Sequence, residues 1–296
     1  MDKILDIHAD DYGYSLNTSE DMLECMKQGS LDSFSIICNT KWFDESMELL
    51  YKAIPQLPFL PLISIHLNLP EGFHESDILP MSWGKLFFAS YGFSRNGIKE
   101  ELKKDIRWQI DKTQDAINKC IRIAAENHIQ YRQSFIRLDS HVHTHLIPIV
   151  WDALTEVIEE GKYEIEYIRN PKEPLMPFVN RFSLWKTYSI VNLIKNRILM
   201  FYSGKVDRYC EKLKIDKMYM CGLMMSGHMD QKRTAEVMPQ MMKLAERNGR
   251  KMEFLFHPGQ AATEEYSDEM NPDYFRDFNS SGNRNIEKEA VLNMKE

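Results

Sequence analysis

Short apolar runs rich in β-branched and aromatic residues alternate with longer segments of helical periodicity along most of the chain. Such alternation is typical of repeated β/α units, in which parallel strands form a sheet and helices cover it. The predicted strands are residues 4–13, 33–39, 62–69, 135–140, 163–169, 218–225 and 252–256. The predicted helices are residues 17–29, 43–54, 98–127, 148–160, 184–201 and 234–247, with one more at 285–295.

Polar side chains follow the first, third, fourth and seventh of these strands. In an open sheet the ends of such distant strands need not be neighbours, whereas a barrel brings all the carboxyl ends around one mouth. The pattern therefore favours an α/β barrel of about seven parallel strands over an open, doubly wound sheet. With 296 residues, 43% of them hydrophobic, we expect a single domain over residues 1–296, with a core at 4–259 and a polar tail at 260–296.

Composition excludes several classes of partner. A net charge of −7 opposes a broad phosphate-binding surface, so we expect no nucleic-acid partner. No apolar run approaches the roughly 18 residues of a membrane span, and the first strand begins too early to leave room for a signal peptide, so we expect no membrane partner. The five cysteines are odd in number, widely spaced and without a C-x-x-C pair, which indicates reduced thiols and a cytoplasmic location.

Two adjacent carboxylates, Asp10 and Asp11, end the first predicted strand just before Gly13. Like charges side by side are costly unless a ligand or a proton uses them. We interpret one as a metal ligand and the other as a proton acceptor. The alternative is a turn or a helix cap, because paired aspartates after a strand are common in both.

Histidines form the second polar group. Asp139 and Ser140 lead into His141, His143 and His145, which would share one side of an extended segment and could converge on one cation. His66 lies within the third strand, where a lone histidine is more often a hydrogen-bonded core residue. His257 precedes Pro258 and is also explained as a strand terminator.

Two stretches are predicted as long loops. Residues 70–97 carry many aromatics without a clean period, and residues 170–182 are punctuated by prolines. Long loops in compact domains often bind ligands, although packing explains the aromatics equally well.

Five motifs in this order resemble the YdjC-like carbohydrate deacetylases, the family that includes chitooligosaccharide deacetylase. They are Ala-Asp-Asp-Tyr-Gly with Asn17, Ile-His-Leu-Asn-Leu-x-Glu-Gly at 65–72, Leu-Asp-Ser-His-x-His-x-His at 138–145, Ile-Arg-x-Pro at 168–171 and Phe-His-Pro-Gly at 256–259. The resemblance implies a distorted (β/α) barrel, related to polysaccharide deacetylases. It also implies a hydrolase that removes the N-acetyl group from an acetylated amino sugar or small oligosaccharide with a divalent metal.

The resemblance also implies residue roles. Asp11, His66 and His141 would be metal ligands, Asp10 the general base for a metal-activated water, and His257 the acid for the leaving amine. Arg169 would anchor a sugar hydroxyl or pair with the aspartates. The residues expected to contact substrate or to support the ligands are His143, His145, Arg169, Asn68 and Glu71.

The metal, the substrate and the assembly stay open at this stage. The family resemblance implies magnesium, whereas two imidazoles and a carboxylate suit zinc or cobalt. The expected partner is a small N-acetylated carbohydrate, and a homodimer is an open option. The alternative functions are a metal-dependent phosphoesterase or cyclic amidohydrolase on the same barrel, and a non-catalytic sugar-binding protein.

Overall fold

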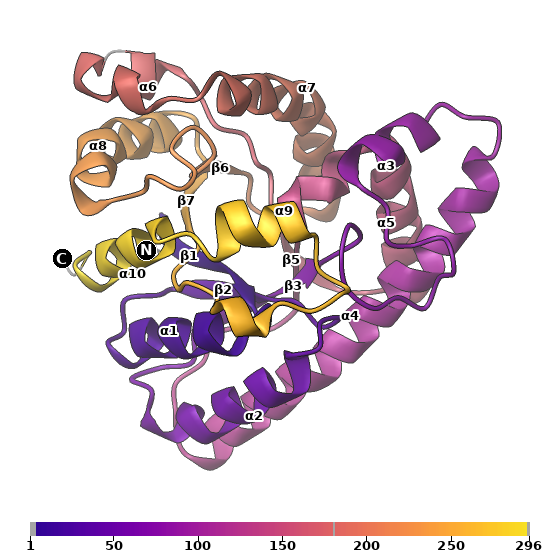
Figure 1. The fold of residues 1–296 in the computed structure, drawn as a ribbon, viewed down its shortest axis with the longest axis horizontal. Helices are drawn as coiled ribbons and strands as arrows, with labels where there is room; N and C mark the ends of the chain where they lie inside the picture. The colour runs from indigo at the N-terminus through magenta and orange to yellow at the C-terminus, as the bar shows by residue number, and fades with distance from the viewer. Residues whose placement is uncertain (1–3, 180, 295–296) are drawn as a thin grey trace.

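The computed structural model describes residues 4–179 and 181–294, without the side chains of residues 186 and 187. Its strands form one parallel sheet in the order β5-β4-β3-β2-β1-β7-β6, curled into a half-barrel (Figure 1). The predicted α/β class and the distorted barrel are thereby confirmed. The strands are β1 (Leu5–Tyr12), β2 (Ser33–Ile36), β3 (Leu62–Leu67), β4 (Ile136–Ser140), β5 (Ile165–Ile168), β6 (Met218–Cys221) and β7 (Lys251–Phe256).

The half-barrel is bridged where its two edge strands approach each other. Beyond β5, the carbonyl of Lys172 accepts a backbone hydrogen bond from Met220 of β6 at 3.1 Å. Inside the curl, Arg169 just beyond β5 reaches Glu253 of β7, with 2.8 Å between Nε and Oε1. The curvature therefore brings side chains of distant strands into one interior.

Helices surround the sheet, and most begin and end near the predicted positions. They are α1 (Leu16–Lys27), α2 (Phe43–Ala53), α3 (Trp83–Ala89), α4 (Arg95–Glu126), α5 (Pro148–Gly161), α6 (Met176–Val179), α7 (Ile190–Leu213), α8 (Gln231–Arg247), α9 (Pro272–Tyr274) and α10 (Asn283–Leu292). The last residue of the helix predicted at 285–295 lies outside the described residues. None of the helices in the described part of the chain is long and apolar enough to cross a bilayer.

Two kinds of prediction are wrong: one helix, which also continues past residue 201 to Leu213, and the two long loops. The helix expected at 184–201 begins at Ile190, because Ser189 caps it by accepting the Val191 N–H, while Phe182–Thr187 forms a separate 3-10 turn. Residues 70–97, expected to be a loop, contain α3 and the start of α4, and the apolar and aromatic residues of α3 give no clean helical period. Residues 170–182, also expected to be a loop, contain the short helix α6. Both errors fall where hydrophobic residues do not mark a buried face.

Candidate metal centre and active site

An irregularity in β1 brings two adjacent aspartates to the same end of the sheet. Successive side chains of a regular strand point to opposite faces. Here the pairing of β1 with β2 shifts between Ala9 and Tyr12, and Asp11 adopts a φ of 74°. Asp10 and Asp11 are consequently both buried at the mouth. Positive φ at a residue with a side chain is unfavourable and concentrates at functional sites.

Asp11, His66 and His141 form a buried cluster at the ends of β1, β3 and β4. Asp11 Oδ1 lies 3.0 Å from His141 Nδ1 and 3.4 Å from His66 Nε2. Two ligand atoms that each lie about 2.1 Å from one ion stand roughly 3.0–3.4 Å apart. The structure thus brings the three expected ligands together at a suitable spacing, while their role as ligands stays a prediction.

The electrostatics of the cluster fit a cation. Asp11 Oδ2 and His141 Nε2 are buried without a hydrogen-bond partner among the described residues, as is expected where a ligand binds. Burial lowers the pKa of His66, but the charges of Asp10 and Asp139 outweigh it and raise that pKa to about 10. Asp11 likewise raises the pKa of His141 against the effect of burial. The site therefore has a negative potential that favours a divalent ion.

Asp139 orients His66. Its Oδ1 accepts a hydrogen bond from His66 Nδ1 at 2.5 Å, which leaves Nε2 directed toward Asp11. A carboxylate behind a ligating histidine fixes the ring and its tautomer. Asp139 was not among the predicted site residues, although it lies two residues before His141.

Arg169 holds Asp10. Its Nη1 and Nη2 donate to Asp10 Oδ2 and Oδ1 at 2.7 and 2.8 Å, and the Ser35 hydroxyl donates to Oδ1 at 3.0 Å. Burial raises the pKa of Asp10, but the charges of Arg169 and His66 outweigh it and hold that pKa well below its usual range. Asp10 is therefore ionised. Arg169 is fully buried and pairs with Asp10 and Asp139, while its contact with a sugar hydroxyl stays a prediction.

The interior of the half-barrel continues this polar cluster away from the mouth. Nε2 of the buried His8 lies 3.0 Å from Asp10 Oδ1 and 2.7 Å from Ser35 Oγ. Glu253 accepts hydrogen bonds from Arg169 and from the Tyr167 hydroxyl. Sequence reasoning missed these residues. The sequence pattern that could have revealed this interior cluster is an alternation of polar and apolar residues along three strands. The polar positions are Asp6, His8 and Asp10 in β1, Ser33 and Ser35 in β2, and Arg137 and Asp139 in β4.

The other two histidines after β4 do not converge with His141. The segment His141–Leu146 is a 3-10 turn, and His143 has a φ of 56°, so the expectation of an extended segment is wrong. His145 is buried, donates from Nε2 to the Arg169 carbonyl at 2.9 Å and accepts from Ser140 at Nδ1. Burial lowers its pKa to about 4, so the ring is neutral. Burial and Arg169 also hold the pKa of His143 well below its usual range.

Glu71 and Asn68 lie on the loop that follows β3. Glu71 is buried and accepts the Tyr14 hydroxyl at 3.1 Å, and the Tyr14 ring stacks on His141 with centroids 6.1 Å apart. Asn68 is buried and donates its amide to Asn39 Oδ1 at 3.2 Å. Glu71 thus supports a ring that lies against a candidate ligand, whereas Asn68 supports the loop.

The C-terminal tail lies against the same site. Tyr274 of α9 packs edge-on to His141 with ring centroids 5.1 Å apart, and Phe278 packs against His257 with centroids 5.6 Å apart. Glu287 of α10 accepts the His257 backbone N–H at 2.7 Å, and its Oε2 lies 3.7 Å from His257 Nδ1. Sequence reasoning treated this tail as a polar appendage, because no motif marks these residues.

Comparison with known proteins identifies the family of this chain. A family model described as YdjC-like protein matches residues 4–294. The chain belongs to the YdjC-like family. A carbohydrate deacetylase from Danio rerio is 24% identical over 183 residues, which cover 59% of this YdjC-like chain and 51% of that protein. The chain therefore spans about half the length of that relative.

A solved structure supports the fold. It comes from Enterococcus faecalis V583, is described as a proposed cellobiose-phosphate cleavage protein, and matches with a TM-score of 0.52. The match covers 99% of this chain and 92% of that one at 17% identity. At that identity the likeness concerns the fold alone.

Proposed function

We propose that this YdjC-like chain is a metal-dependent carbohydrate deacetylase that removes the N-acetyl group of an amino sugar. The observation that carries the proposal is the buried Asp11, His66 and His141 cluster at the mouth, with ionised Asp10 beside it. Family membership and the deacetylase from Danio rerio support the choice of reaction.

Asp11, His66 and His141 would hold the metal. One carboxylate oxygen and two imidazole nitrogens leave positions for water and for a substrate carbonyl oxygen. A bound divalent ion would polarise the acetyl carbonyl and lower the pKa of a water. The donor set suits zinc or cobalt, and family resemblance favours magnesium.

Asp10 and His257 would move the protons. Asp10 Oδ1 lies 3.8 Å from His66 Nδ1, so the ionised carboxylate is next to the metal cluster and can accept a proton from the attacking water. Arg169 holds the carboxylate in one orientation throughout. His257 is 16% exposed and lies against the tail, where its ring can donate to the leaving amine.

The test is acetate release from N-acetylated mono- and disaccharides, including diacetylchitobiose, by metal-stripped protein reloaded with magnesium, zinc or cobalt. We expect acetate only with metal, and none from an Asp11→Ala variant. Asp216→Ala is the matched control, because this exposed aspartate pairs with Lys251 away from the cluster and should keep full activity. Absence of acetate from every sugar, with metal demonstrably bound, would contradict the proposal and direct the search to phosphoesters and cyclic amides.

A further inference from the structure

The first half of α7 presents apolar side chains to solvent. Ile190, Ile194, Ile198 and Phe201 are exposed, and their spacing of four, four and three residues places them on one side of the helix. Asn196, Leu199 and Ser203 on the other side are buried against the protein. This half of the helix therefore has an apolar stripe that faces solvent, while the polar Asn196 faces inward together with Leu199.

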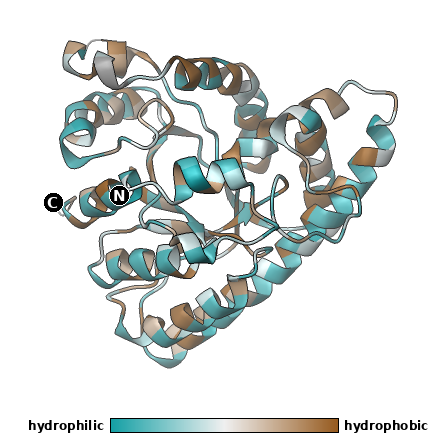
Figure 2. Ribbon diagram, in the orientation of Figure 1, coloured by the Kyte–Doolittle hydropathy of each residue, from teal (hydrophilic) through white to brown (hydrophobic). Residues whose placement is uncertain are grey.

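The stripe continues onto neighbouring segments. The Tyr202 hydroxyl of α7 lies 3.3 Å from the Tyr91 hydroxyl, just beyond α3, which joins two regions distant in sequence. We call the joined surface the apolar rim. Its exposed residues are Phe88, Tyr91, Phe93, Phe182, Trp185, Ile190, Ile194, Ile198 and Phe201. Hydrophobic turns in α6 and α7 are visible in Figure 2.

Acidic residues are missing from both segments that form the apolar rim. Residues 78–99 and 174–206 contain neither Asp nor Glu, although the chain has 44 acidic residues and a net charge of −7. Lys85, Lys195 and Arg197 are exposed, and no carboxylate of the described residues pairs with them. Arg95 and Lys99 differ, because they pair with Asp152 and Glu156 of α5. From outside these two segments, Glu236 of α8 accepts a hydrogen bond from the Ser183 hydroxyl at 2.8 Å. The surface is thus apolar with an excess of basic residues.

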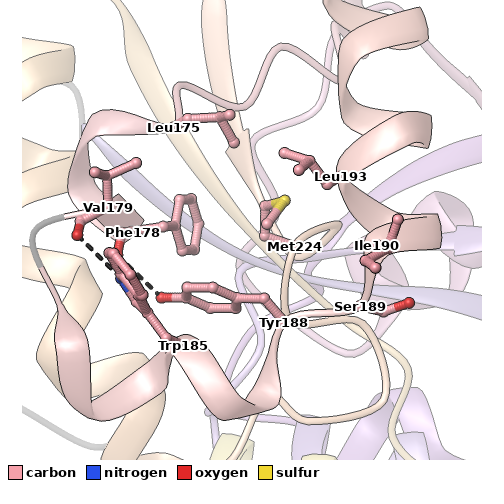
Figure 3. A pocket seen from close by; sticks show the side chains of 9 residues that line it. All are labelled: Leu175, Phe178, Val179, Trp185, Tyr188, Ser189, Ile190, Leu193 and Met224. Carbon is pink, nitrogen blue, oxygen red and sulfur yellow. Dashed lines mark hydrogen bonds between the residues drawn. The ribbon is translucent and has the colours of Figure 1, made fainter.

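An apolar recess opens on this surface. Its volume is about 260 Å³, and its lining includes Leu175, Phe178, Tyr188 and Leu193 together with the exposed Trp185 and Ile190 of the rim (Figure 3). Its wall is held from behind by Glu173, whose carboxylate accepts backbone N–H groups of Gly222, Leu223 and Met224. Specific buried hydrogen bonds therefore hold the wall of the recess in place.

The apolar rim lies at the end of the barrel that carries the metal cluster. In a β/α unit the segment after a strand begins at the carboxyl edge of the sheet, and α7 runs back from there toward β6. The exposed stripe occupies the first half of α7, which is the half near the mouth. A partner on the rim would therefore lie beside the site.

The charge of the rim distinguishes between partners. In a symmetric contact between two copies the same surface faces itself, so Lys85, Lys195 and Arg197 would meet basic residues, with Glu236 the acidic residue that the described contacts place there. Aromatic and aliphatic side chains flanked by Lys and Arg suit the interface of a bilayer that contains anionic lipids. We propose that the apolar rim docks the mouth of the barrel onto an anionic membrane surface. This differs from the expected absence of a membrane partner, which rested on the lack of a spanning segment and of room for a signal peptide and did not consider surface binding.

Vesicle sedimentation tests the proposal and does not depend on the deacetylase reaction. The full chain is mixed with phosphatidylcholine vesicles with or without about one-third phosphatidylglycerol, at low and high salt. We expect co-sedimentation with the anionic vesicles, weakened by high salt. Ile194→Glu with Ile198→Glu should lower the partition coefficient about tenfold or more, since both side chains already face solvent and the fold should persist.

Gln130→Glu with Tyr131→Glu is the matched control. It adds the same charge on exposed residues of the loop before β4, at the opposite end of the sheet, and should bind like the unchanged chain. Equal binding of the two double variants, or no binding to anionic vesicles, would overturn the proposal. Light scattering gives the third outcome: a dimer that dissociates on Ile194→Glu with Ile198→Glu would assign the rim to a second copy and also overturn it.

Discussion

Replacement of Asp139 by asparagine should weaken metal binding without removing any candidate ligand. Asp139 Oδ1 accepts a hydrogen bond from His66 Nδ1 at 2.5 Å. This bond fixes the orientation of the ring, so that Nε2 points toward the cluster. A hydrogen bond to a charged group contributes about 1.5–3 kcal/mol, and one between neutral groups about 0.5–1.5 kcal/mol. The difference of about 1–2 kcal/mol corresponds to a loss of roughly tenfold in metal affinity, at the lower end of the range for such supporting carboxylates.

Glu253→Gln is the matched control for this prediction. Asp139 and Glu253 are both fully buried carboxylates that contact Arg169, at 3.0 and 2.8 Å, but only Asp139 contacts His66. Both substitutions leave Arg169 with one fewer ionic partner and should lower the free energy of unfolding by about 1–3 kcal/mol. Only Asp139→Asn should lower metal affinity.

The assay is competition for zinc with a chelator of known affinity, followed by chemical denaturation of each variant without metal. Unchanged affinity in Asp139→Asn would refute the view that this carboxylate orients His66. Equal losses in both variants would also refute it, because the loss would then come from loosening of the whole buried cluster.

Four further predictions follow from the same geometry. Asp10→Asn should keep the bound metal but lower turnover by about 10²-fold or more, the scale of a lost general base, as measured by acetate release. His141→Ala should lower metal content, whereas His145→Ala should keep it and reduce stability, because among the described residues the His145 ring is hydrogen-bonded to Ser140 and to the Arg169 carbonyl. His257→Ala should slow release of a poor amine leaving group more than release of an activated one. Burial raises the pKa of Glu173 to about 7, so its contribution to stability is full below its unfolded pKa of about 4.5 and is lost as the pH rises through 7. Relative to Glu173→Gln, the chain should thus be more stable at pH 4 than at pH 8 by about 3 kcal/mol, and a constant difference between the denaturation curves would contradict the assignment.

Most of the fold was predictable because the strands are short runs rich in β-branched and aromatic residues that alternate with segments of helical period, even though β1, β2 and β4 also carry polar residues. The sequence could not show how far the sheet closes, since closure depends on curvature and on contacts such as that between Lys172 and Met220. It also misplaced the start of α7, because a helix whose apolar residues face solvent has the same period as one whose apolar residues are buried.

The part of the candidate site that could be predicted consists of motif residues at the ends of strands. Asp11, His66 and His141 lie together because parallel strands end at one edge, and that follows from topology. The separation of His141 from His143 and His145 depends on the positive φ values of Val142 and His143 in the turn. Such values cannot be predicted from these residue types. Glu287 and Tyr274 approach the site from the tail through long-range packing, to which local sequence gives no guide.

The position of β1 also bears on how the chain can be synthesised. This first strand lies between β2 and β7, so one of its edges has no partner until residues 251–256 have left the ribosome. Until then the strand that carries both aspartates is an open edge, and an open edge can pair with other chains. A nascent or prematurely ended chain can hold the aspartates but not the tail that packs on His141 and His257. The complete centre therefore requires β7 and the segment through α10 as well as β1.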